Sequence, residues 1–530
     1  MRILITAAVA SLLQTCLAAN AADWRSRTIY QVFTDRFART DGNTTAPCNV
    51  ANNLYCGGTW KGLEKKLDYI KNMGFTAVWI SPITAQVANA YHGYYQNDLY
   101  SLNPNFGTAH DLRSLAAALH SKGMHLMVDI VPNHMAFAGC PDKIDYRRLK
   151  TLNHPDKFHS YCPIKDTGNQ TELEDCWLGD CNMAMPDIKT EDPQIAGKMN
   201  TWIKWLVSAH NIDGLRIDSV KNVNKAFFPP FCRAAGVFCM GEVSEGRADY
   251  TYSYQEQMDS VLDYPLYYAI TRVFQQKSNM SDLVVALAAC TENQETGCKD
   301  STLLGTFFEN HDNLRFANVT QDLSLVKNAL AFTMLGDGIP IVYQGQEQHF
   351  AGGDDPWCRE ALWSSQFNTT SPLYKYTALL NNIRNHVISH SSSSSRHRNH
   401  HGYAVSGSAP YLAYQTRVLA YTATEMQLRK GEVRTVLSTQ GEQSPSWTLK
   451  TQGMEFDTGK TVLDVLSCTR YAVNWNGEVD VNMRAGGPVV LVEEDVLRGS
   501  DLCTCERGGG SRGYVGIETV GGGEWGPHGS

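Results

Sequence analysis

"GLRIDSVKN", residues 214–222, combines the composition of a buried strand with charges that such a strand rarely carries. Leu215 and Ile217 supply apolar content, whereas Arg216 and Asp218 interrupt it. Charges inside a buried strand are unfavourable unless they are paired or used in chemistry. The stretch therefore predicts a strand whose carboxyl end reaches a functional site.

Seven further apolar runs lie along the first part of the chain: 28–37, 75–84, 125–134, 236–245, 260–267, 302–312 and 339–348. Amphipathic stretches separate several of them, at 63–73, 109–122, 192–209 and 321–335. Strands that alternate with helices indicate an α/β fold with a parallel sheet. Eight such units favour a (β/α)8 TIM barrel over an open doubly wound sheet. The absence of a glycine-rich phosphate-binding sequence after the first run also argues against a dinucleotide-binding fold.

Glycines follow three of the amphipathic stretches closely. Gly74, Gly123 and Gly214 stand just past the expected helix ends. A residue with positive φ commonly closes a helix, and glycine adopts that conformation without strain. We therefore expect all three to be helix caps.

The remaining sequence predicts several separate segments. The barrel is expected in 22–134 and 191–390, with an irregular, lid-like domain inserted at 135–190. Low-complexity residues 391–402 form a spacer, whose histidines fit a solvated loop better than a metal site. Alternating runs predict a C-terminal antiparallel β-sandwich domain at 403–505, and the glycine-rich tail 506–530 is expected to be disordered.

The N-terminus and the cysteines predict export. Residues 1–21 have the positive start, apolar stretch and small-residue cleavage sequence of a signal peptide, and the span is short for a membrane anchor. Fifteen cysteines occur, and loss of Cys16 with the signal leaves an even number, typical of disulfides in a secreted, extracellular protein. Five N-x-[ST] sequons are candidate glycosylation sites: Asn43, Asn169, Asn279, Asn318 and Asn368.

Composition excludes some partners. Hydrophobic residues make up 43% of the chain and charged residues 19%, as in soluble globular proteins. The net charge of −8 does not suggest a nucleic-acid-binding protein, which would carry a basic face. No run after the signal is apolar enough to cross a bilayer, so no membrane anchor is expected, and a monomer is the simplest expectation.

Polar side chains end four of the apolar runs. They are Asp129, Asn133 and His134 in the first run, Arg216 and Asp218 in the second, Glu242 in the third, and His311 and Asp312 in the fourth. The expected cleft acids are Asp218, Glu242 and Asp312. One acid at a strand end is best interpreted as an ordinary salt bridge. Four such ends meet on one face of a parallel barrel, which instead indicates a cleft lined by three acids.

Two carboxylates with different roles are what retaining glycoside hydrolysis requires. Arg216 lies two residues before Asp218 on the same strand face, so its charge favours an ionised carboxylate that acts as nucleophile. Glu242 follows the apolar sequence "VFCM", where desolvation raises the pKa of a carboxyl group and keeps it protonated as an acid.

Four blocks carry a family resemblance: "VDIVPNH" (128–134), "GLRIDSVKN", "GEV" (241–243) and "FFENHDN" (307–313). They resemble those of the α-amylase family, glycoside hydrolase family 13. The resemblance covers roughly residues 22 to 505 and is closest to secreted fungal α-amylases. It implies a hydrolase that cleaves α-1,4-glucosidic bonds inside starch-like glucans. A 4-α-glucanotransferase is the alternative. An inactive carbohydrate-binding homologue is disfavoured because all three acids are present.

The resemblance also implies residue roles. Asp218 would be the nucleophile, Glu242 the acid/base and Asp312 the transition-state stabiliser. Substrate contacts would come from His92, Tyr94, His134, Arg216, Lys221, His311, Asp355 and Arg359. A structural Ca2+ would be held by Asn133, Glu174, Asp187 and the backbone carbonyl of Asn222, a set of oxygen ligands that suits this hard cation.

The family pattern pairs Cys48 with Cys56, Cys162 with Cys176, and Cys468 with Cys503. A further fungal bridge is altered, because Tyr252 stands where one cysteine is expected. That change leaves Cys298 to pair with Cys290. An extra bridge between Cys140 and Cys181 is expected in the inserted domain. Cys232, Cys239, Cys358 and Cys505 stay unassigned.

Several residues depart from the family pattern. Asn222 replaces the usual histidine, Tyr95 a tryptophan, Thr167 a tyrosine and Ser244 a leucine. Asparagine is shorter than histidine and cannot carry its charge. We expect either a tolerated substitution or a change in whether water or a sugar attacks the glycosyl-enzyme intermediate.

Overall fold

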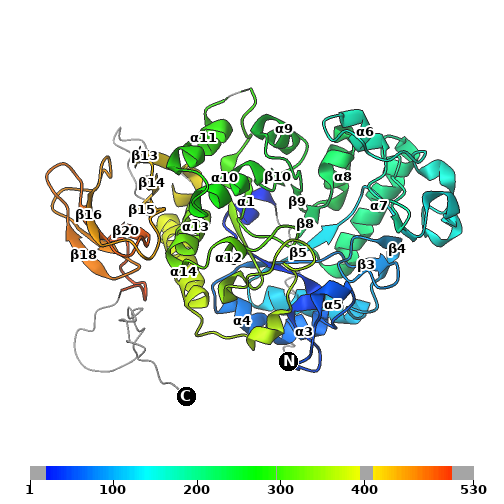
Figure 1. Ribbon diagram of the computed structural model, residues 1–530, viewed down its shortest axis with the longest axis horizontal. Helices are drawn as coiled ribbons and strands as arrows, with labels where there is room; N and C mark the ends of the chain where they lie inside the picture. The colour runs from blue at the N-terminus through cyan, green and yellow to red at the C-terminus, as the bar shows by residue number, and fades with distance from the viewer. Residues whose placement is uncertain (1–19, 294, 394–409, 504–530) are drawn as a thin grey trace, which may run out of the picture.

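The computed structural model describes residues 20–293, 295–393 and 410–503 (Figure 1). Almost all of the expected signal peptide, most of the spacer, Cys505 and the glycine-rich tail lie outside these residues. Figure 1 shows the C-terminal strands at one end of the molecule and the inserted domain with α6 (Gln170–Asp175) at the other, with the barrel between them.

Eight parallel strands form the barrel: β1 (Ile29–Val32), β2 (Ala77–Ile80), β5 (His125–Ile130), β8 (Gly214–Ile217), β9 (Phe238–Gly241), β10 (Ser260–Val261), β11 (Gly305–Thr306) and β12 (Ile339–Tyr343). Their order in the sheet is β10-β9-β8-β5-β2-β1-β12-β11. A parallel bridge between Leu262 and Gly305 joins the two ends of this order. The predicted (β/α)8 barrel is thus confirmed, with one strand inside each expected run.

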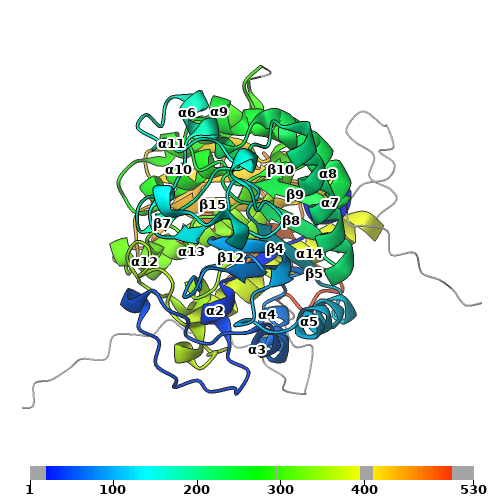
Figure 2. The same ribbon diagram turned by 90° about the vertical axis from the view of Figure 1, so that its right-hand side faces the viewer.

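Helices pack around the barrel strands (Figure 2). The longer ones are α3 (Trp60–Lys65), α5 (Ala109–Ser121), α7 (Pro193–His210), α8 (Phe228–Ala235), α10 (Tyr264–Phe274), α11 (Met280–Thr291), α13 (Leu323–Leu335) and α14 (Pro372–Ser393). Short helices are α1 (Ala21–Arg25), α2 (Thr34–Phe37), α4 (Leu67–Lys71), α9 (Ala248–Tyr252), α12 (Phe316–Val319) and α15 (Pro410–Ala413).

Only the first two residues of the run 260–267 are strand, and its second half is helix. Asp263 caps α10 by accepting a hydrogen bond from the Leu266 amide at 3.1 Å, and Pro265 lies in the first helical turn. A capping carboxylate followed by proline starts a helix even where the sequence is apolar and aromatic. Tyr264 is therefore the first residue of α10, a short distance after the end of β10.

Gly74 and Gly123 have the positive φ expected of helix caps, 84° and 70°. The expectation for Gly214 is wrong, because α7 is closed by Asn211 with φ 55° and Gly214 belongs to β8. A Cβ on Gly214 would lie 2.5 Å from the Trp24 ring. Close packing against the indole therefore accounts for this glycine.

The inserted segment between β5 and β8 has little regular structure. It contains α6 and the paired strands β6 (Phe137–Ala138) and β7 (Met183–Ala184). A separate hairpin, β3 (Thr84–Gln86) and β4 (Gln96–Leu102), lies earlier in the chain, after β2. Disulfides Cys140–Cys181 and Cys162–Cys176 cross-link the segment. Its compactness thus depends on covalent links as well as on packing.

The C-terminal domain is antiparallel. Six strands pair in the order β13 (Arg417–Tyr421), β14 (Glu425–Lys430), β15 (Val433–Ser438), β20 (Val489–Glu493), β17 (Thr461–Asp464) and β18 (Thr469–Ala472), and β16 (Trp447–Lys450) pairs with β19 (Asp480–Met483). The domain is fixed to the barrel by a buried ion pair, in which Lys430 Nζ lies 2.6 Å from Asp337 Oδ1.

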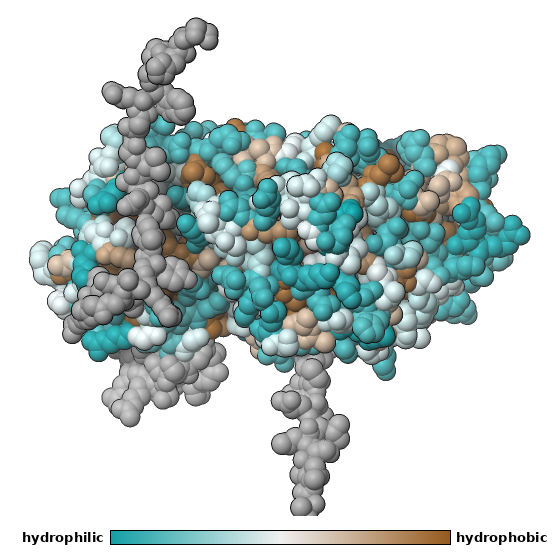
Figure 3. Space-filling view, turned by 90° about the horizontal axis from the view of Figure 1, so that it is seen from below, coloured by the Kyte–Doolittle hydropathy of each residue, from teal (hydrophilic) through white to brown (hydrophobic). Residues whose placement is uncertain are grey.

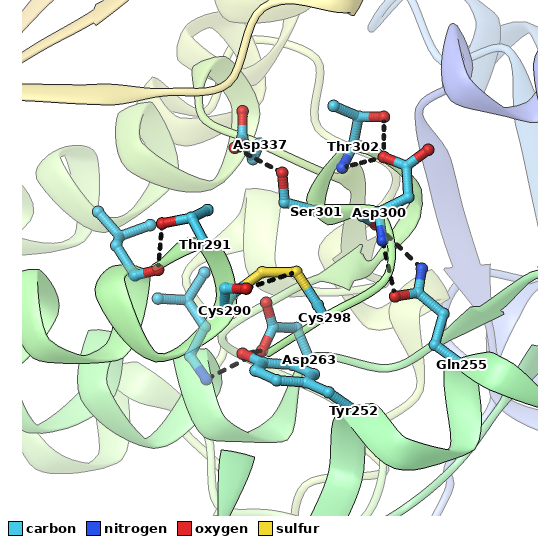
Figure 4. The surroundings of a disulfide bond; sticks show 12 residues. Tyr252, Gln255, Asp263, Cys290, Thr291, Cys298, Asp300, Ser301, Thr302 and Asp337 are labelled. Atoms are coloured by element: carbon cyan, nitrogen blue, oxygen red, sulfur yellow. Dashed lines mark hydrogen bonds between the residues drawn. A yellow bond between two sulfur atoms is a disulfide. The ribbon is translucent and has the colours of Figure 1, made fainter. Parts of the chain in front are cut away.

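Disulfides also join Cys48–Cys56 and Cys468–Cys503, as the resemblance implied. Cys290 pairs with Cys298, as expected from the altered fungal bridge. Figure 4 shows the Cys290–Cys298 bridge close to Tyr252, whose hydroxyl donates to Asp263 Oδ1 at 2.9 Å. The tyrosine that replaces a family cysteine thus has a buried hydrogen-bond partner of its own. Within the described residues, the free cysteines are Cys232, Cys239 and Cys358.

The face of the molecule in Figure 3 is mainly hydrophilic, with apolar residues in small separate patches. Among the described helices, none is both long and apolar enough to cross a membrane.

Candidate active site

The carboxyl ends of β8 and β9 bring two acids together around one arginine. Asp218 directly follows β8, and Glu242 directly follows β9. Arg216 Nη1 lies 2.7 Å from Asp218 Oδ1, and its Nη2 lies 2.8 Å from Glu242 Oε1. All three side chains are buried, so the guanidinium holds the two carboxylates in a fixed relationship.

A third carboxylate, Asp129 on β5, contacts the same arginine. Its Oδ1 lies 3.0 Å from Arg216 Nη1, and the two residues are directly opposite each other in the paired strands. Burial raises the pKa of Asp129 to about 8, although the attraction of Arg216 opposes the shift. Sequence reasoning did not assign Asp129 to the site. The available signal was an acid inside an apolar run that ends in further polar residues.

Glu242 has the protonation behaviour of an acid catalyst. Desolvation raises its pKa to about 7 despite the opposing charge of Arg216, and the nearby negative charge of Asp218 adds to the increase. The Tyr264 hydroxyl donates to Oε1 at 3.1 Å, and the Ser219 amide donates to Oε2 at 3.3 Å. Tyr264 was missed because its run was interpreted as a strand.

Asp312, in the loop after β11, is held from the opposite side by Arg359. Arg359 Nη2 lies 3.2 Å from Asp312 Oδ1, and its Nη1 lies 2.7 Å from Asp355 Oδ1. Desolvation raises the pKa of Asp312, but neighbouring positive groups, Arg359 and Arg216 among them, outweigh it and leave the pKa below its ordinary value. Asp312 therefore remains ionised beside the protonatable Glu242.

Neutral polar groups complete this part of the site. The Tyr94 hydroxyl donates to Asp129 Oδ2 at 2.8 Å and lies 2.7 Å from His311 Nε2, while His134 Nε2 lies 3.0 Å from the Tyr94 carbonyl. Desolvation lowers the pKa of both His92 and His311 to about 3. These imidazoles are therefore uncharged at neutral pH and suited to hydrogen bonds with hydroxyl groups.

A cavity of about 500 Å³ lies beside Glu242, between the barrel and the inserted domain. Its lining includes Thr167, Leu173, Trp177, Leu178, Ser219, Lys221, Asn222 and Ser244. The side-chain Nδ2 of Asn222 donates to the Leu173 carbonyl at 3.1 Å, and Lys221 Nζ donates to the Ser244 carbonyl at 2.9 Å. Each of these two side chains thus uses one of its N–H donors within the protein.

Tyr95 does not line that cavity. Its ring centroid lies 4.4 Å from the ring centroid of His92. Three of the four positions expected to depart from the family pattern, Thr167, Asn222 and Ser244, therefore line the Glu242 cavity, and the fourth does not.

The residues expected to bind calcium lie where the inserted domain meets the barrel. The Ile188 amide donates to the Asn133 carbonyl at 2.9 Å, which places Asp187 next to Asn133. Gln170 Nε2 donates both to Glu174 Oε1 at 2.7 Å and to the carbonyl of Lys221 at 3.1 Å, adjacent to Asn222.

Unpartnered oxygens give this region a cation-binding character. Among the residues that the structure describes, no hydrogen-bond partner faces the buried Asn133 Oδ1 or Asp187 Oδ1. Buried polar atoms are normally satisfied, so two such oxygens fit a bound cation. In the part of the chain that the structure describes, no group of three or more His, Cys, Asp or Glu side chains forms a metal cluster. The expected set differs from such a cluster because it includes amide and carbonyl oxygens.

Comparisons with known proteins identify the family. The family model "Alpha amylase, catalytic domain" matches residues 31–378, and "Alpha-amylase, domain C" matches residues 418–510. Alpha-amylase 2 of Schwanniomyces occidentalis is 42% identical, over 91% of this chain and 93% of its own. An alpha-amylase of Saccharomycopsis fibuligera is 43% identical, over 92% of this chain and 94% of its own.

A solved structure agrees with both. The alpha-amylase of Malbranchea cinnamomea superposes with a TM-score of 0.86 at 45% identity, over 92% of this chain and all of that one. The agreement covers the barrel, the inserted segment and the C-terminal domain together. The chain therefore belongs to the α-amylase family.

Proposed function

We propose that this protein is an α-amylase that hydrolyses internal α-1,4-glucosidic bonds of starch-like glucans with retention of configuration. The observation that carries the proposal is the contact of Arg216 with both Asp218 and Glu242 at the barrel mouth. It pairs a carboxylate held by a positive charge with a carboxyl group whose pKa is raised to about 7. Retaining hydrolysis needs one of each.

In the first step, Asp218 attacks the anomeric carbon while Glu242 gives its proton to the leaving glycosidic oxygen. The C–O bond breaks, and a covalent bond to Asp218 forms. In the second step, Glu242, now a carboxylate, takes a proton from water as that water attacks the same carbon and releases Asp218. Two inversions give net retention. Asp312, ionised and nearby, stabilises the positive charge that develops on the sugar.

The neutral residues position the substrate. His92, His134 and His311 present uncharged nitrogens, and Tyr94 presents a flat ring to the sugar at the cleavage point. Asp355 and Arg359 contact glucose units further along the retained part of the chain. The leaving part occupies the cavity beside Glu242, near Lys221.

A calcium ion at Asn133, Glu174, Asp187 and the Asn222 carbonyl would tie the inserted domain to the barrel. The unpartnered oxygens of Asn133 and Asp187 support this assignment. The ion supplies a fixed charge and cross-link when bound.

Export is part of the proposal. The signal-peptide pattern and the disulfides support a secreted protein that acts outside the cell, and a monomeric glycoprotein remains the simplest form of the proposal. The side chains of Asn43, Asn169, Asn279, Asn318 and Asn368 are exposed, as glycan acceptors must be.

Transfer to a sugar is the second candidate reaction. The cavity beside Glu242 has room for a glucose unit, and no charged imidazole stands at position 222. A sugar bound there would compete with water for the intermediate.

One product analysis tests both reactions. Wild-type protein and Asp218→Asn are each incubated with maltoheptaose and Ca2+, and chain lengths and reducing ends are measured. Hydrolysis gives only shorter chains with new reducing ends. Transfer gives chains longer than the substrate while reducing ends stay nearly constant. Activity that persists in Asp218→Asn would overturn the assignment of the nucleophile.

A further inference from the structure

Trp357 is an exposed indole on a well-fixed loop at the active-site rim. Its side chain is 52% exposed, although tryptophan is normally buried. It lies between Asp355 and Arg359 in the loop that follows β12. Within the described residues, its ring makes no ring–ring contact, so no aromatic neighbour inside the protein covers it.

Hydrogen bonds on both sides fix the backbone around Trp357. Its amide donates to the Asp354 carbonyl at 2.7 Å, and the Arg359 amide donates to the Pro356 carbonyl at 3.1 Å. The buried Cys358 thiol donates to the His311 carbonyl at 3.2 Å. A ring on such a loop loses little conformational freedom when a ligand packs on it.

The loop lies across the barrel mouth from the Glu242 cavity. In the closed strand order, β12 is four strands from β8 in either direction. The cavity belongs to the β8 and β9 side, and Asp312 is held by Arg359 from the β12 side. A glucan chain that crosses the mouth with its leaving part in the cavity therefore extends its retained part towards the β12 side, where the loop of Trp357 lies.

We propose that Trp357 is a stacking platform for a glucose unit of the retained part, beyond the units contacted by Asp355 and Arg359. This inference rests on the proposed function and names a determinant of substrate length. The flat indole matches the apolar face of a pyranose ring, and tryptophan offers the largest such surface. A chain too short to reach the platform gains nothing from it.

The test compares Trp357→Ala and Trp357→Phe with Trp475→Ala. Trp475 is 85% exposed, but it lies in the C-terminal domain, so it controls for loss of a surface indole. For maltoheptaose, Trp357→Ala should lower kcat/KM roughly threefold to tenfold, mainly through KM. Maltotriose should be cleaved as by the wild type. Trp357→Phe should restore most of the loss, and Trp475→Ala should change neither substrate.

The same variants give a positional readout. With maltoheptaose labelled at its reducing end, Trp357→Ala should shift the distribution of cleaved bonds, because binding on the retained side is weakened. An unchanged distribution with unchanged kcat/KM would overturn the platform. An equal loss on maltotriose and maltoheptaose would also overturn it, since it would indicate a disturbed catalytic loop.

Failure of the proposed function is separable from failure of this inference. If the wild type cleaves no glucan, the proposed function is wrong. Calorimetric binding of maltoheptaose to Asp218→Asn, with and without Trp357→Ala, then tests the platform without turnover. Equal affinity in the two proteins would overturn it.

Discussion

Arg216 Nη2 lies 2.8 Å from Glu242 Oε1, yet the pKa of Glu242 is raised to about 7. Burial therefore outweighs the attraction of a guanidinium in direct contact. The same arginine is shared with Asp218 and Asp129, which spreads its charge over three carboxylates. This sharing places the proposed nucleophile Asp218 next to a carboxyl group, Glu242, whose pKa is raised.

The pH dependence of catalysis follows from this arrangement. Glu242 must be protonated to act as the acid, and its protonated fraction falls as pH rises through about 7. We expect kcat/KM on maltoheptaose to fall about tenfold per pH unit above that point. Glu242→Gln should lose roughly a hundredfold to ten-thousandfold in kcat at neutral pH. A wild-type profile without a basic limb near neutrality would contradict the assignment.

Asp129 should be needed for both stability and rate. Asp129→Asn keeps the shape but puts an NH2 group, which cannot accept a hydrogen bond, in place of one of the two oxygens that accept from Arg216 and Tyr94 in the barrel interior. We expect a loss of about 1–3 kcal/mol in the free energy of unfolding, measured by denaturant titration, and a lower kcat. Asp41→Asn is the matched control, because Asp41 is exposed and pairs with Arg39 at the surface. Equal effects of the two substitutions would show that Asp129 has no special role.

The sequence was sufficient to predict the barrel and the strand ends at which the acids lie. Apolar runs followed by polar residues mark strand ends, and parallel strands bring those ends to one face. The raised pKa of Glu242 was also foreseeable, since the preceding "VFCM" fills β9 with buried side chains.

Side-chain pairings across the sheet could not be predicted from the sequence in the same way. Contact between Asp129 and Arg216 depends on the register of β5 against β8, which no local pattern specifies. Tyr264 reaches Glu242 only because Asp263 starts a helix inside an apolar run. The Asn222 amide is bound to Leu173, a residue 49 positions away in the inserted domain.

Two glycines allow the cost of a steric clash to be compared with the cost of a left-handed backbone conformation. Gly214→Ala would place a methyl group 2.5 Å from the Trp24 ring, and overpacking of this kind costs about 1–3 kcal/mol. Gly123 has φ 70° with nothing within 4 Å of its Cβ position, so Gly123→Ala costs only the left-handed conformation, about 1 kcal/mol. Thermal unfolding should rank Gly214→Ala as the less stable. The opposite order would argue against contact with Trp24.

Removal of calcium should loosen the junction of the inserted domain and the barrel. A chelator should lower Tm, because a ligand bound only by the folded state stabilises it by mass action. Asp187→Asn weakens the proposed ligand set, so its Tm should respond less to added Ca2+. Asp180→Asn, an exposed change in the same inserted domain, should respond like the wild type. A Tm that is insensitive to chelation would contradict the site.

The change at position 222 should alter the fate of the glycosyl-enzyme intermediate. The Asn222 amide is held by the Leu173 carbonyl at 3.1 Å and lines the cavity where a leaving or incoming sugar lies. An imidazole is larger, so Asn222→His should break that bond and place a titratable group in the cavity. At high maltoheptaose concentration, we expect fewer chains longer than the substrate, relative to new reducing ends, than in the wild type. Asn222→Ala removes the same hydrogen bond without adding an imidazole and is the matched control. If both variants give the wild-type ratio of long chains to reducing ends, residue 222 does not select between water and sugar.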